Sequence, residues 1–349
     1  MKNIYNYTLK DLGDLMIGLG QKQFRANQLY SWIYQKRVKE FDEMSDVSLS
    51  FRQTLKQEFT LKLPKIIKKQ VSYDGTIKLL LELEDKSVIE VVLMRYDYGN
   101  VVCVSSQVGC NMGCKFCASG LIKKQRDLTA GEMVSQVMMI QSLLDEEEES
   151  KRVSHVVIMG SGEPFDNYNN VMNFIRIINE QKGLAIGARH ITVSTCGLPN
   201  KIVEFSKEGL QVNLAISLHA SNDETRNKIM PINKAYPLTK LFKAINEYEK
   251  NANRRVTIEY ILLKDLNDSI DNARELVKLL KGTFAYVNLI PYNEVKENPF
   301  KRSNKERVRA FYEELKRNGV NVTIRKEFGE DIDAACGQLR AKKEGVIDE

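Results

Sequence analysis

The sequence predicts an α/β fold built as a partial (β/α)6 barrel, with an N-terminal helical accessory domain and a small β extension. After residue 100, short β-branched or apolar runs alternate with helical stretches, which is the rhythm of parallel strands joined by crossover helices. About six such units are present, too few for an eightfold barrel, so an open partial barrel is expected. Polar and cysteine-containing loops follow several runs, and α/β folds carry their chemistry in such loops.

Residues 1–64 are expected to form the helical accessory domain. Thr8 precedes leucines at helical spacing, and Gly20 provides a stop. A second amphipathic stretch contains Phe24, Leu29 and Trp32, whose side chains are expected to pack in a core.

Residues 65–99 are expected to form the β extension, with strands at 76–83 and 88–94 separated by a charged turn. Residues 100–340 are expected to hold the barrel and a catalytic C-terminal segment, and residues 341–349 a tail. The barrel strands are expected at residues 101–105, 154–159, 191–195, 212–217, 256–262, 285–290 and 320–325, with helices such as 130–144 and 272–280 between them.

Length and composition exclude some classes of protein. A chain of 349 residues suggests two domains or one barrel with an appendage. The net charge of +6 is compatible with a nucleic-acid partner but does not require one. No apolar run approaches the roughly 18 residues of a membrane span, and no secretory signal is evident, so we expect a cytoplasmic protein with reduced thiols.

Three cysteines within eight residues, Cys110, Cys114 and Cys117, are the most informative feature of the chain. A structural zinc site and a fully ligated iron-sulfur cluster each use four ligands. Three thiolates can hold a [4Fe-4S] cluster while one iron stays open to a substrate. A disulfide framework is disfavoured because six cysteines are sparse for this length, and neither Cys103 nor any histidine offers a fourth zinc ligand at a familiar spacing.

This Cys-x3-Cys-x2-Cys spacing, with Phe116 before the last cysteine, resembles the signature of the radical S-adenosylmethionine (SAM) enzymes. The amino and carboxylate groups of SAM suit the open iron. One βα unit later come Gly160, Gly162 and Glu163. Glycines let a backbone approach a cofactor, and the carboxylate can accept hydrogen bonds from the ammonium of SAM.

Further segments extend the resemblance to the RlmN/Cfr family of radical SAM RNA methyltransferases. They run in order from the N-terminal helices to Leu339 and comprise Glu90 and residues 103–110, 159–167, 194–195, 217–219, 230–233, 291–293 and 331–339. The Cfr-type branch, which methylates C8 of the same adenosine, usually lacks a proline after Gly-x-Gly-Glu. Pro164 and Asn167 are therefore typical of the RlmN-type, dual-specificity C2 branch, whereas Cys196 departs from the serine common in relatives.

The resemblance implies a set of site residues. Its metal ligands are Cys110, Cys114 and Cys117. Its catalytic residues are Glu90, Cys103 and Cys336. Its SAM contacts are Gly162, Glu163, Ser194, Ser217, Leu218, His219 and Asn293, with a main-chain role for Leu218; His155 and His190 keep a structural interpretation.

The family's route, as the resemblance implies it, uses two SAM molecules because C2 of adenine is too electron-poor to attack the methyl group of SAM. The Cys336 thiolate first takes a methyl group by displacement. A 5′-deoxyadenosyl radical from the second SAM then takes hydrogen from that methyl group, and the methylene radical adds to C2. Glu90 or another base removes the C2 proton, and Cys103 attacks the Cys336 sulfur to release the product and leave a disulfide.

The implied substrates are one adenosine of 23S rRNA near the peptidyl transferase centre and the adenosine that follows the anticodon in certain tRNAs. The target base must be splayed out, because C2 is hidden in a stacked helix. An electron donor such as flavodoxin and a monomeric state are expected. Basic residues that are candidates for RNA contact are Lys22, Arg25, Lys36, Arg37, Lys123, Lys124, Arg126, Arg254 and Arg255 and the segment 301–309.

Two other classes of function stay open as alternatives. Another radical SAM chemistry is one; a methylthiotransferase would need a second cluster, and no cysteine precedes Cys103. A non-enzymatic iron-sulfur RNA-binding module is the other, and it leaves the Gly-x-Gly-Glu loop and the Cys336 segment unexplained.

Overall fold

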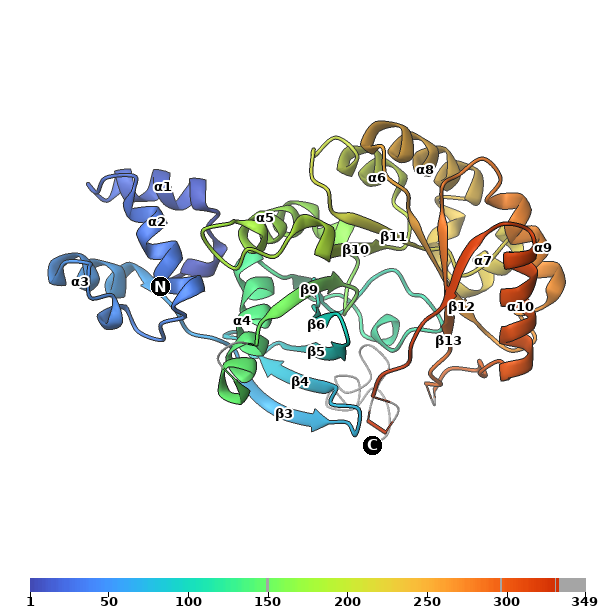
Figure 1. Ribbon diagram of the computed structural model, residues 1–349, viewed down its shortest axis with the longest axis horizontal. Coiled ribbons are helices and arrows are strands. Elements are labelled where there is room, and N and C mark those ends of the chain that lie inside the picture. Colours follow the sequence, from blue (N-terminus) through green and yellow to red (C-terminus); the bar gives the residue numbers. More distant parts are fainter. Residues whose placement is uncertain (149–150, 296, 330, 333–349) are drawn as a thin grey trace.

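A ten-stranded sheet forms the centre of the protein in the computed structural model, which describes residues 1–148, 151–295, 297–329 and 331–332 (Figure 1). The strands lie in the order β14-β13-β12-β11-β10-β9-β6-β5-β4-β3. Their bounds are β3 (Lys65–Val71), β4 (Ile77–Glu82), β5 (Val88–Tyr96), β6 (Gly99–Cys103), β9 (Val153–Ile158), β10 (Ile191–Thr195), β11 (Asn213–Ser217), β12 (Thr257–Leu262), β13 (Tyr286–Pro291) and β14 (Asn321–Ile324).

The pairs from β6 through β14 are parallel, whereas β3, β4, β5 and β6 are joined antiparallel. Each parallel strand from β6 to β13 is followed by at least one helix, and β14 completes the series. Because β14 and β3 are edges of the sheet, the barrel stays open. The predicted partial barrel of six β/α units is therefore confirmed.

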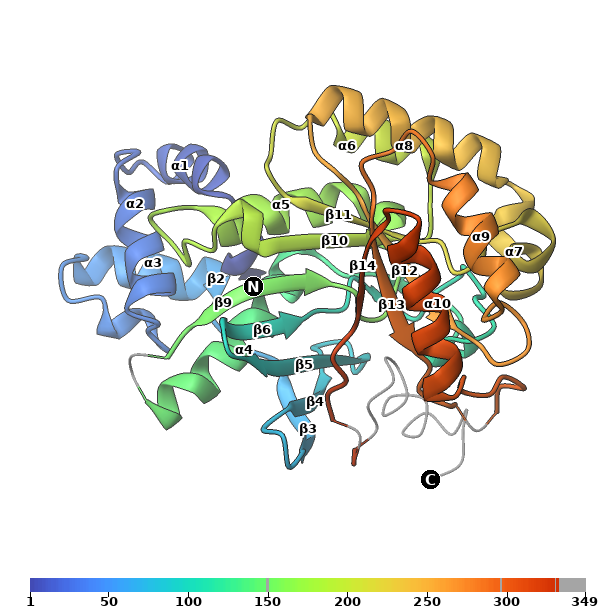
Figure 2. The same ribbon diagram turned by 45° about the vertical axis from the view of Figure 1, so that its right-hand side comes forward.

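Helices surround the outside of the curved sheet (Figure 2). They are α4 (Ala130–Glu147), α5 (Tyr168–Asn179), α6 (Pro199–Phe205), α7 (Asp223–Ile229), α8 (Leu238–Ala252), α9 (Ile270–Leu279) and α10 (Lys305–Arg317). Local sequence fixes where several begin: Thr129 and Glu132 form a capping box at α4, and Ser269 and Asn272 form one at α9. Their apolar faces and the buried strands share one large hydrophobic core.

The N-terminal segment forms α1 (Leu9–Gly18), α2 (Arg25–Tyr30) and α3 (Leu49–Glu58), beside the barrel (Figure 1). Thr8 caps α1, as its sequence predicts. The segment is fixed to the barrel where Gly131 N, at the start of α4, donates to Asn6 Oδ1 at 2.7 Å. A Cβ at Gly131 would lie 2.7 Å from that oxygen, so this contact requires a glycine.

Strand β3 was absent from the sequence prediction. Its Lys-Ile-Ile-Lys-Lys-Gln-Val sequence lacks the period-two alternation of a half-buried strand. It lies at the edge of the sheet, where exposed lysines such as Lys65, Lys68 and Lys69 discourage pairing with another chain. In the described part of the chain, no helix has both the length and the apolar character needed to cross a membrane.

Candidate active site

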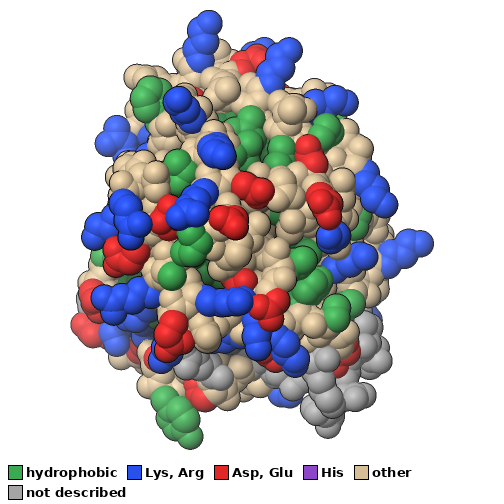
Figure 3. Space-filling model, turned by 90° about the vertical axis from the view of Figure 1, so that its right-hand side faces the viewer, with side chains coloured by type: hydrophobic (Ala, Val, Ile, Leu, Met, Phe, Trp, Pro, Cys, Tyr) green, Lys and Arg blue, Asp and Glu red, His purple; other side chains and the backbone are tan. Residues whose placement is uncertain are grey.

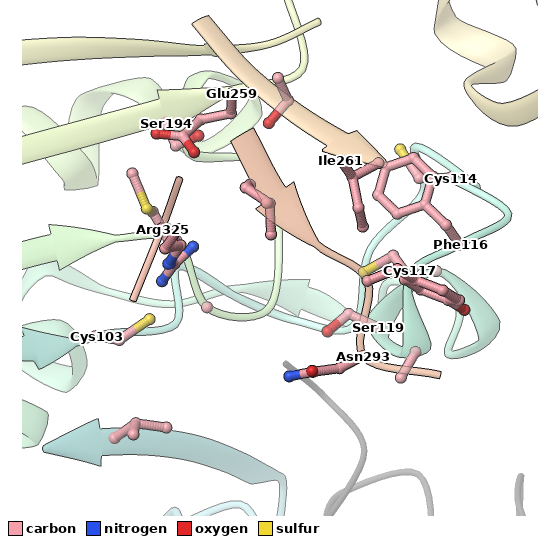
Figure 4. A pocket seen from close by; sticks show the side chains of 18 of the residues that line it. Cys103, Cys114, Phe116, Cys117, Ser119, Ser194, Glu259, Ile261, Asn293 and Arg325 are labelled. Carbon is pink, nitrogen blue, oxygen red and sulfur yellow. The ribbon is translucent and has the colours of Figure 1, made fainter. Parts of the chain in front are cut away.

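A cavity of about 320 Å³ opens among the C-terminal ends of the barrel strands (Figure 4). It brings together residues from loops that are far apart in the sequence. Of the catalytic, SAM-binding and cluster-binding residues expected from the sequence, those on its wall are Cys103, Cys110, Cys114, Cys117, Gly162, Glu163, Ser194, Ser217, His219 and Asn293. Cys336 lies outside the described residues.

The cysteine loop, residues 110–117, lies between the short strands β7 (Gln107–Val108) and β8 (Arg126–Asp127). Lys115 N donates to Ile229 O at 2.9 Å, which attaches the loop to the end of α7. The Phe116 ring meets His219 edge-on, with ring centroids 4.8 Å apart. The loop is thus held by β11 and α7, and Figure 4 shows Cys114, Phe116 and Cys117 at one end of the cavity.

Burial raises the pKa of Cys110 to about 12 and that of Cys114 well above its usual range. Thiolates at these positions therefore need a cation beside them. Within the described residues, no three His, Cys, Asp or Glu side chains are arranged around one metal ion. The thiolates of a [4Fe-4S] cluster bind different irons rather than one ion, so this donor set fits a cluster.

The Gly160–Gly162 loop follows β9 and packs closely against residues 104–107, which follow β6. Gly162 has a φ of +106°, and a Cβ there would lie 2.5 Å from Gln107 Cβ. A Cβ at Gly160 would lie 2.7 Å from Val104 O. Both glycines are therefore required by contacts within the protein, whereas the sequence had indicated only approach to a cofactor.

Glu163 is buried and connects this loop to the end of β10. Its Oε1 accepts a hydrogen bond from Phe165 N at 2.9 Å, and its Oε2 accepts one from Cys196 N at 2.7 Å. Burial raises the pKa of Glu163, and these donors oppose that rise. The Glu163 carboxylate is thus fixed on the cavity wall, where its charge suits an ammonium group.

His219 follows β11 with a φ of +58°. Its Nδ1 accepts a hydrogen bond from Ile261 N at 3.1 Å, which places the proton of the neutral ring on Nε2. Burial lowers the pKa of His219 to about 3, so the ring is neutral at physiological pH. Leu218, by contrast, is not on the cavity wall: its N–H donates to Glu259 O, and its carbonyl accepts from Arg226.

Arg226 was not selected from the sequence. It is fully buried on α7, and its guanidinium donates to the carbonyls of Cys196 at 2.7 Å and Leu218 at 3.0 Å. It also donates to Asn233 Oδ1 at 2.8 Å. It thereby holds the ends of β10 and β11 together under the cysteine loop. An arginine between polar residues usually indicates an exposed position, so the sequence carries no signal of this burial.

Ser119 was also missed. Its Oγ is buried on the cavity wall close to the cysteine loop, and no hydrogen-bond partner for it exists among the described residues. Figure 4 shows Ser119 beside Cys117 and Asn293. Buried hydroxyl groups are usually hydrogen-bonded, so Ser119 Oγ is suited to bond a polar ligand in the cavity, such as SAM.

A buried ion pair lies near the other end of the cavity. Lys78 Nζ on β4 is 3.1 Å from Glu90 Oε2 on β5, and their side chains are 1% and 5% exposed. Lys78 and Cys103 both line the cavity. Gly329 N donates to Asp74 Oδ2 at 2.9 Å, so the chain that leads towards Cys336 begins against the β3–β4 turn.

Many of the predicted RNA-contacting residues have acidic partners. Lys124 pairs with Asp166 at 2.7 Å, and Arg126 pairs with Glu132 at 2.7 Å. Arg307 likewise pairs with Asp268. On the face shown in Figure 3, Lys and Arg are interspersed with Asp and Glu rather than gathered in one patch. The stacked His155 and His190 rings are not on the cavity wall.

This chain is similar to known proteins in both sequence and structure. A family model described as the radical SAM superfamily matches residues 104–280, and one described as the ribosomal RNA large subunit methyltransferase N-terminal domain matches residues 2–61. A protein of Enterococcus faecalis named "Probable dual-specificity RNA methyltransferase RlmN" is 58% identical over 98% of this chain and 97% of its own. A protein of the same name from Streptococcus pyogenes serotype M2 is 56% identical over 97% and 96%.

Among solved structures, a radical SAM methyltransferase from Sphaerobacter thermophilus has a similar fold. Its TM-score is 0.92 at 41% sequence identity, and the match covers 97% of this chain and 99% of that one. The likeness therefore includes the N-terminal helices and the β extension as well as the barrel.

Proposed function

Because this chain belongs to the RlmN family within the radical SAM superfamily, we propose that it methylates C2 of one adenosine in 23S rRNA and C2 of the adenosine that follows the anticodon in tRNAs. It is a radical SAM RNA methyltransferase, and its substrates are RNA. The names of the curated relatives give a dual-specificity RNA methyltransferase, which supports two classes of RNA substrate. Pro164 and Asn167, which are typical of the C2 branch, support C2 over C8.

The enzyme uses a [4Fe-4S] cluster and SAM. When bound, they would supply the electron that cleaves SAM and starts radical chemistry, and would take back the electron that the adduct at C2 loses. We propose that Cys110, Cys114 and Cys117 hold the cluster. For SAM we propose contacts from Gly162, Glu163, Ser194, Ser217, Leu218, His219 and Asn293, which is supported by the cavity that most of them line.

The remaining steps belong to residues of the chain. Cys336 carries the methyl group as a thioether and, after loss of one hydrogen, forms the bond to C2. Glu90 receives the C2 proton, and the Lys78 ammonium lies 3.1 Å from its carboxylate. Cys103, on the cavity wall, then attacks the Cys336 sulfur as a thiolate and forms a disulfide with it. The bond from that sulfur to the product carbon breaks, and the carbon takes a proton from solvent to become the methyl group.

We also propose the finer assignments of partners and organisation. An electron donor such as flavodoxin serves a monomeric, cytoplasmic enzyme, in keeping with thiols that must stay reduced. The chain divides into an accessory domain at residues 1–64, a β extension at 65–99, the barrel with its catalytic segment at 100–340 and a tail at 341–349. The accessory domain contributes RNA contacts.

One observation supports this function above the others: the cluster loop, the Gly-x-Gly-Glu loop and the resolving thiol of Cys103 open on the same cavity. The test is mass spectrometry of nucleosides from rRNA and tRNA of cells lacking this chain and of the same cells re-expressing it. We expect 2-methyladenosine in both RNA classes to disappear and return. Return of 8-methyladenosine instead would assign the chain to the C8 alternative.

A further inference from the structure

Glu259 is a buried carboxyl group in the cavity that has no part in the function proposed above. It lies in the middle of β12 and is 5% exposed, and its side chain contributes to the cavity wall. Figure 4 shows Glu259 with Ser194 and Arg325 in the part of the cavity away from the cysteine loop. A carboxyl group in this position must have a compensating partner, because burying it alone is costly.

Strand register places Glu259 in a polar row across the barrel. Its Cα pairs with Ser217 on β11 and with Asn288 on β13, so the three side chains point to the same face of the sheet. Asn288 Nδ2 donates to Glu259 Oε2 at 2.9 Å. Among the described residues, no hydrogen bond reaches Oε1 of Glu259, and the cavity lies in front of this side chain.

We propose that Glu259 binds the ribose hydroxyls of a nucleoside held in the cavity, with Asn288 fixing the orientation of its carboxylate. Vicinal hydroxyls donate well to one carboxylate, and an acidic side chain on a ribose hydroxyl is the same solution that dinucleotide-binding folds use. Ser217, next in the row, supplies a further polar group at the same level.

The charges around Glu259 agree with this role. Burial raises the pKa of Glu259, whereas the Arg325 guanidinium and the Asn288 amide oppose the rise. Hydroxyl donors on the free oxygen act in the same direction as these two groups, because hydrogen bonds to the charged form favour it. Hydrogen bonds from a bound ribose therefore add to the stabilisation of the buried carboxylate that Arg325 and Asn288 provide.

Two nucleosides share this chemistry. SAM carries free 2′ and 3′ hydroxyls, whereas an adenosine inside an RNA chain has only its 2′ hydroxyl. The inference rests on the proposed function only in that one of these two occupies the cavity. Its test must separate them, and it must also separate binding from a purely structural role of Glu259.

The experiment measures equilibrium binding to the cluster-loaded enzyme under anaerobic conditions. The probes are S-adenosylhomocysteine with its 2′-deoxy and 3′-deoxy analogues, and an rRNA hairpin with adenosine or 2′-deoxyadenosine at the target position. For wild-type protein we expect one deoxy replacement to weaken binding about 10- to 100-fold, the range of a charge-assisted hydrogen bond. This arm needs no variant, so it does not depend on a mutant that folds.

Glu259→Gln is then measured against the same probes. We expect it to bind the hydroxylated probe about 10-fold more weakly or worse, and to lose most of its discrimination against the deoxy form, because the two changes remove one interaction. If Glu259→Gln loses discrimination between S-adenosylhomocysteine and its deoxy analogues, the site belongs to SAM. If it loses discrimination between the two hairpins, the site belongs to the RNA adenosine. If Glu259→Gln discriminates against the deoxy form of both probes as strongly as the wild type does, the inference is overturned.

Glu249→Gln is the matched control. Glu249 on α8 is 6% exposed, accepts a hydrogen bond from Phe284 N at 3.1 Å and is not on the cavity wall. Its replacement should change stability without changing deoxy discrimination. Methylation of RNA by the wild-type enzyme is recorded in parallel, so a failure of the proposed function is seen separately from a failure of the Glu259 assignment.

Discussion

Replacing Lys78 with methionine removes the cationic partner of Glu90, the proposed acceptor of the C2 proton, from a buried ion pair. At 3.1 Å two unit charges attract by about 5 kcal/mol if the effective dielectric constant is about 20. Loss of one partner of a buried pair costs about 3–5 kcal/mol, because the other charge is left uncompensated. We therefore expect Lys78→Met to lower the free energy of unfolding by about 3–5 kcal/mol.

The assay is urea unfolding of the wild type, Lys78→Met, Glu90→Gln and the double variant, analysed as a double-mutant cycle. The double variant should be more stable than Lys78→Met, since it lacks the buried Glu90 charge that Lys78 compensates. Lys86→Met is the control: its partner Glu82 is 3.0 Å away near the same hairpin, but Lys86 is 79% exposed, so its loss should be under about 1 kcal/mol. A coupling energy near zero for Lys78 and Glu90 would refute the reasoning.

Three further predictions concern the cysteines and His219. Cys336→Ala should abolish RNA methylation but leave the charge-transfer absorbance of the cluster intact; methylation that persists in a methyl-transfer assay would rule out the carrier role. Cys103→Ala should accumulate a protein–RNA adduct through Cys336, seen by gel shift and mass spectrometry, because nothing then displaces the product; a turnover reaction with no adduct would count against resolution by Cys103. The pKa of His219 falls from its ordinary value of 6.5 to about 3 on folding, so its contribution to stability is complete above pH 6.5 and is lost as the pH falls towards 3. His219→Asn, which keeps an acceptor for Ile261 N and tolerates the positive φ, should therefore be less sensitive than the wild type to acid in this range; equal pH dependence of their unfolding would contradict this assignment.

The sequence was sufficient for the fold because the barrel strands are strongly apolar. The strand predicted at 191–195 has those bounds in the structure. The helix predicted at 130–144 begins where expected and ends slightly later, at Glu147. Strand β3 was not predicted because its lysines interrupt the alternation of apolar and polar residues that indicates a strand. This edge strand is held by its pairing with β4 in a hairpin, and not by a buried face of its own.

The sequence predicted the motif residues of the candidate site but not its buried charged residues. Motif residues such as Glu163 and His219 were found through spacing and resemblance, and the structure brings them into one cavity. Lys78, Arg226 and Glu259 were not found, since a charged residue within a short run predicts exposure. Only strand register and tertiary packing show that their partners are nearby.

The fate of the methyl hydrogens tests the central claim most directly. Reconstituted enzyme is supplied with SAM whose methyl group carries three deuterium atoms, and the methylated adenosine is weighed by mass spectrometry. Transfer through Cys336 removes one deuterium before the carbon reaches C2, and a solvent proton replaces it, so the account predicts a product methyl group with two deuterium atoms. A methyl group that keeps all three would mean direct transfer from SAM and would contradict the account.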